Sequence, residues 1–503
     1  MKRALVLSLL SAALVAGGCS VGPNYVRPDA PTSDSFKELE GWRTARPRDD
    51  VLRAAWWELY DDPVLTDLVE QVPPANQSLK AAEAAFQQAR TLVWQARSNW
   101  YPTAVAGVSF SRSRVSANLS GGTQVSHVGT VSGGPSTRGA RGFGGTISSD
   151  YTLPGSISWE LDLWGKIRRQ VESSEASAQA SAADLANTQL SLQSELALDY
   201  FQLRTLDAMK RLLEDTAKTY ERSLTLTQNR HQEGIASGAD IAQAQTQLES
   251  TLAQAVDVGV QRAAMEHAIA VLIGKPPADF SLPPVAELAA TPPPIPAGVP
   301  SELLERRPDV ATAERNMASA NASIGVAVSA WYPTVTLSAS GGFESSDIAK
   351  WLLWPSRFWS VGPSVSETIY DAGRRSAQID QARAAYDENV DTYRQTVLTA
   401  FQQVEDQLAA LRILEEEAEV QDRAVKAAQD SVRLTTNQYE GGIVSYLNVV
   451  VVNAAALSNE QTAVNIQGRR LAASVQLVQA LGGGWSAGEI PSTRDLEQGR
   501  PWF

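Results

Sequence analysis

Two long stretches of the chain carry apolar residues at the spacing of a coiled coil. Neither stretch contains Pro. In residues 165–231 the apolar side chains fall on two heptad positions: Leu185, Leu192, Leu196, Leu203, Leu206, Leu213, Ala217, Tyr220 and Leu224. In residues 373–440 the first set recurs every seven residues: Val390, Val397, Val404, Leu411, Ala418, Val425, Val432 and Tyr439, with Ile379, Tyr386, Tyr393, Ala400 and Leu414 at the partner position. The pattern predicts two coiled-coil helices, each about 100 Å long.

Polar residues interrupt the first seam at Gln189, Asp199 and Lys210. Each long helix is followed by a turn containing Gly and by a shorter predicted helix, residues 240–273 and 449–481. A further helix before each long one, ending at Trp100 and at Trp331, supplies the length that the return helix lacks. An ordinary helical bundle is the alternative, but it does not account for equal long arms beside strand pairs.

Four shorter stretches alternate apolar and small polar residues with a period of two. They cover residues 103–112, 145–161, 334–343 and 358–369, and Pro154 and Pro363 interrupt two of them. This period predicts strands. Strands that are apolar on one face and rich in Ser and Thr on the other fit either a transmembrane barrel or a soluble antiparallel sheet with one buried face.

The chain contains an internal duplication. Trp100–Pro102 recurs as Trp331–Pro333, residues 163–166 correspond to 371–374, and Gly234–Ser237 recurs as Gly442–Ser445. The last two pairs share one offset, and the first copy has a longer Gly- and Ser-rich loop between its strands. Each copy therefore reads as a helix, two strands, a long helix, a Gly turn and a return helix.

The N-terminus has the layout of a bacterial lipoprotein signal. Lys2 and Arg3 precede an apolar run, which ends in Gly17, Gly18 and Cys19. We expect Cys19 to be lipidated and to become the mature N-terminus, although Ala16 stands where such signals favour Leu. A simple signal peptide with an incidental Cys is the alternative. Ser20 after the Cys indicates sorting to the outer membrane.

This sorting signal favours the barrel over the soluble sheet. Four strands cannot close a barrel, and an open edge cannot face lipid because its backbone groups are unpaired. Three copies of the chain would supply twelve strands. Aromatic residues then suit the two membrane interfaces: Trp100, Tyr101, Trp331 and Tyr332 on one side, and Trp351, Trp354, Phe358 and Trp359 on the other.

Composition excludes several functional classes. One Cys and three His among 503 residues argue against a disulfide framework and against a Cys- or His-rich metal centre. The formal net charge of -13 argues against a nucleic-acid binder. Glu266-His267 lacks the second His of a metalloprotease motif, and the run Glu415–Glu417 lies on a solvated helix face. We therefore expect neither an enzyme nor a resident cofactor.

Several motifs together resemble the outer-membrane factor family, the TolC-like channels, and above all its lipoprotein branch associated with resistance-nodulation-division (RND) efflux, the NodT family. The resemblance covers nearly all of the mature chain. It rests on five segments: Cys19 with residues 21–25, Trp56–Leu65, Trp159–Gly165, Pro300–Asp309 and Asp371–Arg375.

The resemblance implies a fold class and a set of partners. The fold is α+β and mainly α, with a duplicated strand pair plus long coiled-coil helices. In a homotrimer, it forms a 12-stranded outer-membrane β-barrel continuous with a periplasmic α-helical tunnel. Implied partners are a periplasmic adaptor, an inner-membrane RND-type pump and outer-membrane lipids. The only covalent group is the lipid on Cys19, and the transported substrate stays open.

The same resemblance assigns roles to the two helix turns. Docking to the adaptor is implied for Arg230, Gly234, Ile235, Ala236, Ser237, Gly441, Gly442, Ile443, Val444 and Ser445. The family's Arg four residues before the turn Gly is present as Arg230, but Gln438 stands at that place in the second copy. For the Gly residues, a turn alone is the alternative role.

The aperture of the tunnel is expected just past the second turn, at Tyr446, Leu447 and Val451. A bulky apolar ring can block a narrow pore by dewetting. A core position at the start of the helix is an equally good interpretation of these residues. Val451 replaces an Asp found in many relatives, so a charged aperture ring is in doubt. We expect Asp240 to be the N-cap of its helix.

The predicted organisation has six parts. Residues 1–18 form the signal peptide, 19–76 a lipidated equatorial segment, 77–274 the first repeat, 275–307 a Pro-rich linker, 308–481 the second repeat and 482–503 an equatorial tail. The leading hypothesis is the exit duct of a tripartite efflux system. The alternatives are the outer-membrane duct of a type I-like protein secretion system and a structural coiled-coil lipoprotein.

Overall fold

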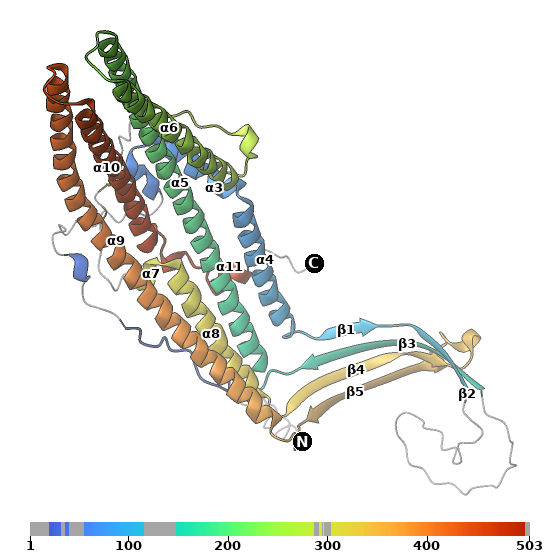
Figure 1. Ribbon diagram of the computed structural model, residues 1–503. Coiled ribbons are helices and arrows are strands. Elements are labelled where there is room, and N and C mark those ends of the chain that lie inside the picture. Colours follow the sequence, from blue (N-terminus) through green and yellow to red (C-terminus); the bar gives the residue numbers. More distant parts are fainter. Residues whose placement is uncertain are drawn as a thin grey trace, which may run out of the picture. The chain divides into compact units, whose positions relative to one another are not determined.

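A computed structural model describes residues 20–31, 36–39, 55–114, 147–285, 291–293, 295 and 303–497, which fold as two units (Figure 1). Unit 1 comprises residues 1–23, 94–172 and 322–382, and contains a β-sheet. Unit 2 comprises residues 24–93, 173–321 and 383–503, and is built around long helices. Among the described helices, none combines the length and apolar character that crossing a membrane requires.

The sheet in unit 1 is antiparallel, with the order β1, β3, β4, β5 and with β2 also paired to β3. Its strands are β1 (Thr103–Ala106), β2 (Ser109–Arg114), β3 (Ile147–Glu160), β4 (Thr334–Ser345) and β5 (Arg357–Ser366). The strands of the two sequence copies therefore meet at the pairing of β3 with β4. This confirms the four predicted strand regions, with one break in the first.

That break lies at Gly107 and Val108, which separate β1 from β2. The registers of β1 and β2 on β3 place these two residues opposite Pro154 and Leu153. Pro154 has no N–H to donate, so the ladder loses a bond at this point. The remaining contact, from the amide of Gly107 to the carbonyl of Pro154, measures 3.0 Å. The proline that interrupts one predicted strand thus divides its neighbour.

Register across the sheet separates an apolar face from a polar one. Ala104, Ile157, Ala339 and Val361 lie side by side in one row. Ser156, Ser340 and Ser360 form the next row, on the opposite face. Ile157 and Val361 are 48% and 65% exposed, because within the described part of the chain no second layer covers the apolar face. The alternation predicted from the sequence is therefore present on a sheet with two open edges.

Unit 2 contains two long helical hairpins. The first is α5 (Lys166–Gln232) with α6 (Gly238–Leu272), and the second is α9 (Arg374–Glu440) with α10 (Tyr446–Ala480) (Figure 1). Both long helices have 67 residues, with their first turns in unit 1. At 1.5 Å per residue each measures about 100 Å. The predicted ends of α5 and α9 are correct within one residue, whereas both return helices begin two or three residues earlier than predicted.

The heptad seams form the core of these hairpins. Leu196, Leu203, Leu213, Val397 and Val404 are each at most 1% exposed. Towards the turns the seams thin out, and Leu224, Val425 and Val432 are only partly buried. Packing towards the turns is therefore uneven, since Tyr220 and Tyr439 of the same seams are only 2% and 5% exposed.

Shorter elements complete the two units. They include α3 (Pro63–Ala75), α4 (Gln77–Ser98), α7 (Leu303–Arg306), α8 (Pro308–Ser329), α11 (Thr493–Glu497) and, among the described residues, six short 3-10 helices. In unit 2 the segment after Asn24 runs along α8 and α9. Tyr25 donates to Glu314 at 2.6 Å, Arg27 donates to the Tyr393 hydroxyl at 2.9 Å, and Arg412 pairs with Glu38 at 2.6 Å.

Candidate functional site at the two helix turns

The two hairpin turns in unit 2 have the same backbone geometry. In the first, the amide of Ile235 donates to the carbonyl of Arg230 at 2.8 Å, and Gly234 adopts a left-handed φ of 78°. In the second, Ile443 donates to Gln438 at 2.8 Å, and Gly442 has a φ of 74°. Both are Schellman motifs. Gly is favoured at their left-handed position because, without a Cβ, it adopts a positive φ at little steric cost.

The helix after the first turn starts with a capping box. Ser237 is the N-cap, and its hydroxyl accepts from the amide of Asp240 at 3.2 Å. The Asp240 carboxylate accepts in return from the Ser237 amide at 2.9 Å. The expectation that Asp240 is the N-cap is therefore wrong. It is the third helical residue, and the Ser-x-x-Asp spacing was the sequence signal for this arrangement.

In the second turn this box is incomplete. Ser445 is the N-cap of α10 but makes no side-chain capping bond. Asn448 stands where Asp240 stands in the first copy, and its side-chain amide donates to the Ser445 hydroxyl at 3.2 Å. A hydroxyl that accepts from this side chain leaves the amides of the first turn without a side-chain acceptor.

Arg230 ties the first hairpin to the second. Its guanidinium donates to the carbonyls of Tyr439 and Glu440 at 2.9 and 3.1 Å, and lies 4.6 Å from the centre of the Tyr439 ring. A cation at the last carbonyls of a helix also interacts favourably with the helix dipole. Arg230 thus caps the C-terminus of α9, which is a role that the sequence did not indicate.

A small apolar core lies beneath the two turns. It contains Ala244, Tyr439, Tyr446 and Val449, and the rings of Tyr439 and Tyr446 meet edge to face at 5.4 Å. Tyr446 is only 2% exposed. Its ring packs between the helices, which favours the alternative interpretation of Tyr446 as a core residue over a place in the aperture.

The other candidate residues remain accessible. Ile235 and Ile443 are 62% and 76% exposed at the ends of the two turns. Leu447 and Val451 are 53% and 60% exposed and lie one turn apart on α10. Ala236 and Val444 are partly buried, and Ser237 and Ser445 are exposed caps. The turns thus present two exposed isoleucines, and α10 presents a separate apolar pair.

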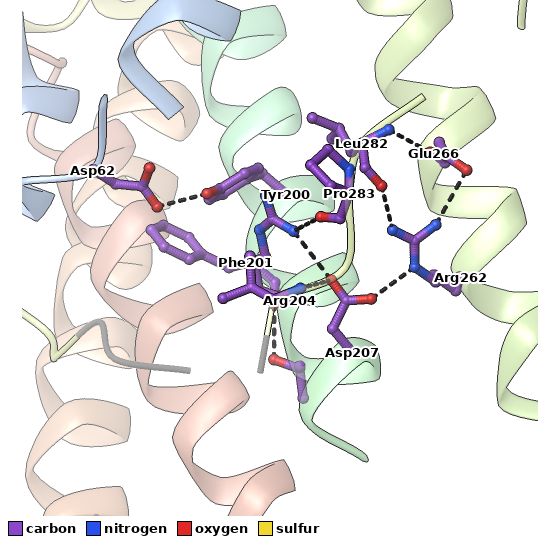
Figure 2. Close-up of polar contacts among 11 residues, drawn as sticks. Asp62, Tyr200, Phe201, Arg204, Asp207, Arg262, Glu266, Leu282 and Pro283 are labelled. Atoms are coloured by element: carbon purple, nitrogen blue, oxygen red, sulfur yellow. Dashed lines mark hydrogen bonds and ion pairs between the residues drawn. The ribbon is translucent and has the colours of Figure 1, made fainter. Parts of the chain in front are cut away.

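A buried ionic network joins α5 to α6 further along the first hairpin (Figure 2). Asp207 accepts from Arg262 at 2.6 Å and from Arg204 at 3.1 Å, and its side chain is 1% exposed. Arg262 also pairs with Glu266 at 3.2 Å. We call Arg204, Asp207, Arg262 and Glu266 the ionic clamp. Two positive and two negative charges compensate each other, as buried charges require.

The ionic clamp also binds the backbone that follows α6. Arg262 donates to the carbonyl of Leu282 at 2.6 Å, and Arg204 donates to that of Pro283 at 2.9 Å. Beside the clamp, Tyr200 donates to Asp62 at 2.6 Å, and burial together with this bond raises the pKa of Tyr200 to about 12. Sequence reasoning missed the clamp, because two of its pairs have the three- and four-residue spacings of ordinary surface pairs and the third joins residues 55 apart.

Two expectations lie outside the described residues. Cys19 and nearly all of the Gly- and Ser-rich loop after β2 belong to this part of the chain. Within the described part, no group of three or more His, Cys, Asp or Glu residues is placed to hold a metal ion.

Comparisons with known proteins agree with this architecture. The chain matches the profile of the outer membrane efflux protein family over residues 68–275 and 299–483. It is 32% identical to the toluene efflux pump outer membrane protein TtgC of Pseudomonas putida, over 95% of this chain and 96% of that protein. The antibiotic efflux pump outer membrane protein ArpC of Pseudomonas putida has the same identity and coverage.

Solved structures show the same fold. The outer-membrane channel OprN superposes with a TM-score of 0.82 at 28% identity, covering 93% of this chain and all of that one. The open state of the outer-membrane channel MtrE of Neisseria gonorrhoeae superposes with a TM-score of 0.77 at 27% identity, covering 93% and 99%. The chain therefore belongs to the outer membrane efflux protein family.

Proposed function

We propose that three copies of this chain form the exit duct of a tripartite efflux system, through which solutes cross the outer membrane. The open sheet carries this proposal. It has an apolar face without a covering layer, and its two edges, β1 with β2 and β5, each pair on one side only within the described chain. Such edges have no stable arrangement in lipid until other copies pair with them.

Exposed apolar stripes on the helices support the same assembly. On α9, Ile413, Val420, Ala427 and Leu434 are exposed at heptad spacing. On α6, Leu252, Val256 and Val260 are exposed at four-residue spacing. Because the two stripes lie on different helices, each meets a different surface in a head-to-tail contact, and such contacts form a ring when the rotation between copies closes.

The turns are the proposed docking site for a periplasmic adaptor. Ile235 and Ile443 are the exposed apolar anchors, held by the paired Schellman turns and by Arg230. The inner-membrane pump supplies the energy in this proposal, and the duct makes or breaks no bond. Lipidation of Cys19 anchors each copy to the outer membrane.

Leu447 and Val451 are the proposed aperture. Planar-bilayer recordings of the purified trimer test it, with low conductance expected for the parent and higher conductance for Leu447→Ser. Ala239 occupies the corresponding place in the first turn, so Ala239→Ser is the matched control and should leave conductance low. Absence of conductance from parent and Leu447→Ser alike would contradict the channel.

Docking is tested apart from conduction with the double variant Ile235→Asp, Ile443→Asp. Dye accumulation in cells should rise to the level of the deletion strain, because a charge cannot enter an apolar contact without a partner. The purified variant should conduct like the parent. Unchanged dye accumulation in the double variant would overturn the docking assignment. In the deletion strain, unchanged accumulation together with loss of a secreted protein would favour the secretion duct.

The substrate does not follow from these similarities. Relatives of equal identity carry the names of a toluene pump and of an antibiotic pump. In the proposed system the inner-membrane pump selects the solute, and the duct passes on what it receives.

A further inference from the structure

Residues that directly follow the predicted lipidation site are held in place within unit 1. The amide of Val21 donates to the carbonyl of Trp164 at 3.1 Å. Arg169 donates to the carbonyls of Val21 and Gly22 at 3.3 and 3.4 Å. The Arg169 side chain is 4% exposed. A buried guanidinium that binds two consecutive carbonyls fixes both the path and the direction of this short segment.

Glycines make the close approach possible. A Cβ at Gly22 would lie 2.5 Å from the Cα of Gly325, and a Cβ at Gly165 would lie 2.9 Å from the Cα of Ser20. Gly22 and Gly165 also have left-handed φ angles of 94° and 78°. The N-terminal segment, the start of α5 and the C-terminal part of α8 thus approach one another more closely than residues with side chains permit.

Arg169 fills the space beside Gly325. A Cβ at Gly325 would lie 2.8 Å from Cγ of Arg169. The guanidinium also pairs with Glu172 at 2.8 Å, so its charge is balanced while its other N–H groups reach Val21 and Gly22. Gly325 therefore leaves room for the side chain that holds the N-terminal segment.

Aromatic residues at the junction of helix and sheet surround this place. The Trp164 indole donates to the carbonyl of Pro333 at 2.8 Å and stacks on Tyr332 at 4.9 Å between ring centres. Tyr332 and its neighbour Trp331 belong to the predicted interfacial belt. The Val21 amide is thus bound to a residue that is itself bound to this belt.

We propose that Trp164, Gly165, Arg169 and Gly325 form a binding site, the N-terminal seat, for the chain's own residues Ser20–Gly22. The site fixes where the acylated terminus leaves the protein. This inference rests on the proposed lipidation of Cys19. Since Cα atoms of consecutive residues are about 3.8 Å apart, fixing Ser20 confines the Cα of the lipid-bearing residue to that distance from it. The anchor is then part of the membrane-facing belt, and not the end of a loose tether.

A spin label at residue 21 tests the seat in the purified, lipidated protein in vesicles. Val21→Cys supplies the thiol, since thioether formation blocks Cys19. The protein with Val21→Cys as its only change, the parent of this series, should give an immobilised electron paramagnetic resonance spectrum. The reason is that the label sits on a segment bound through its backbone. Gly325→Leu should remove the immobilised component, since its side chain displaces Arg169.

Gly259→Leu is the matched control. Gly259 also lies inside a helix, but nothing lies within 4 Å of a Cβ placed there. Arg169→Gln is a second variant, in case Gly325→Leu does not fold, and Arg168→Gln is its exposed neighbour control. Both controls should keep the immobilised spectrum, and Arg169→Gln should lose it. A mobile spectrum in the parent, or an immobilised one in both seat variants, would overturn the seat.

The mass of the N-terminal peptide tests the lipidation of Cys19 separately from the N-terminal seat. A peptide that begins at Cys19 and carries acyl groups supports lipidation, and an unmodified Cys19 contradicts it. Should Cys19 be unmodified, its replacement by Ser leaves residue 21 as the single label site, and the spectra still decide whether Ser20–Gly22 is bound.

Discussion

At the scale of single residues, the two turns show how a duplicated motif has diverged. Positions 208 apart share the backbone, and four of the differing pairs matter most: Arg230 and Gln438, Gly238 and Tyr446, Ala239 and Leu447, Asp240 and Asn448. The first turn has the capping box and the Arg that reaches the other hairpin. The second has the buried Tyr446 and the exposed Leu447. One turn therefore fastens the pair, and the other presents the proposed aperture.

Restoring the missing cap should stabilise the second turn. Asn448→Asp gives the amide of Ser445 a carboxylate acceptor, as Asp240 does for Ser237. The expected gain is about 0.5–1 kcal/mol, seen as amide exchange around residues 445–449 that is a few-fold slower by mass spectrometry. Asp240→Asn should speed up exchange in the first turn by a similar factor. Equal exchange in Asn448→Asp and parent would show that the cap does not limit opening.

Asp199 predicts a dependence of stability on pH. It interrupts the heptad seam, and burial, reinforced by the charge of Glu195, raises its pKa to about 6 from a usual 3.8. The folded state therefore binds the proton more tightly than the unfolded state. The resulting stability is fully present below pH 3.8 and is lost as the pH rises through 6.

Removing this charge should flatten the profile. Asp199→Asn should raise the thermal midpoint of the helical circular dichroism signal at pH 7 but hardly at pH 4. The gain in the free energy of unfolding at pH 7 is at most about 3 kcal/mol for a two-unit shift. Asp257→Asn, on an exposed carboxylate of α6, is the control and should follow the parent. Equal midpoints for Asp199→Asn and parent at pH 7 would contradict the raised pKa.

At the scale of elements, the hairpins are held by different means at different levels. Close to the turns, Arg230 links the first hairpin to the end of α9. Further along α5, the ionic clamp joins α5, α6 and the segment after α6. Between these points Leu213, Ala217 and Tyr220 of the α5 seam are each at most 4% exposed, whereas Leu224 is only partly buried. A long helix pair fastened at intervals keeps its register even where its core is thin.

Breaking the ionic clamp should be costly. Asp207→Ala leaves Arg204 and Arg262 without their shared carboxylate, and removing one partner from a buried network costs about 3–5 kcal/mol. A marked fall in the thermal midpoint is expected. Asp215→Ala removes an exposed carboxylate of α5 that pairs with Lys218, and such pairs contribute little, so it serves as the control. Similar midpoints for both variants would show that the clamp is not a major source of stability.

The sequence predicted elements better than their interiors. The ends of α5 and α9 followed from an unbroken heptad pattern without Pro, which is local information. The split between β1 and β2 depends on Pro154 of the neighbouring strand, and the burial of Tyr446 depends on Tyr439 of another helix. Such pairings join residues that are distant in the chain, and periodicity does not record them. The capping box at Ser237 was readable, but Asp240 was taken for the cap itself.

At the scale of the whole molecule, the proposed trimer depends on surfaces that a single chain leaves uncovered. These are the apolar face and edges of the sheet, and the stripes on α6 and α9. Exposed apolar residues at heptad positions do not stabilise a monomer, since exposing their apolar surface to water is unfavourable. Burial against neighbouring copies accounts for their pattern.

Charges on the α6 stripe should prevent assembly. The double variant Val256→Glu, Val260→Glu is expected to give monomers in detergent by light scattering, because the introduced carboxylates cannot enter an apolar seam without a partner. Ser250→Glu with Gln261→Glu adds the same two charges to the same helix away from the stripe, and should remain trimeric. If the variant with Val256→Glu and Val260→Glu still forms trimers, the contact between copies does not run along the α6 stripe.

The unequal edges of the sheet also have a genetic consequence. In a ring of three, each copy pairs β5 with a different strand of its neighbour, so one copy with a damaged edge leaves a gap that the other two cannot close. If half of the copies in a cell carry the damage and still join rings, only about one ring in eight contains three sound copies. Mutations in an edge strand should therefore be dominant over the normal gene, whereas mutations that abolish folding should be recessive.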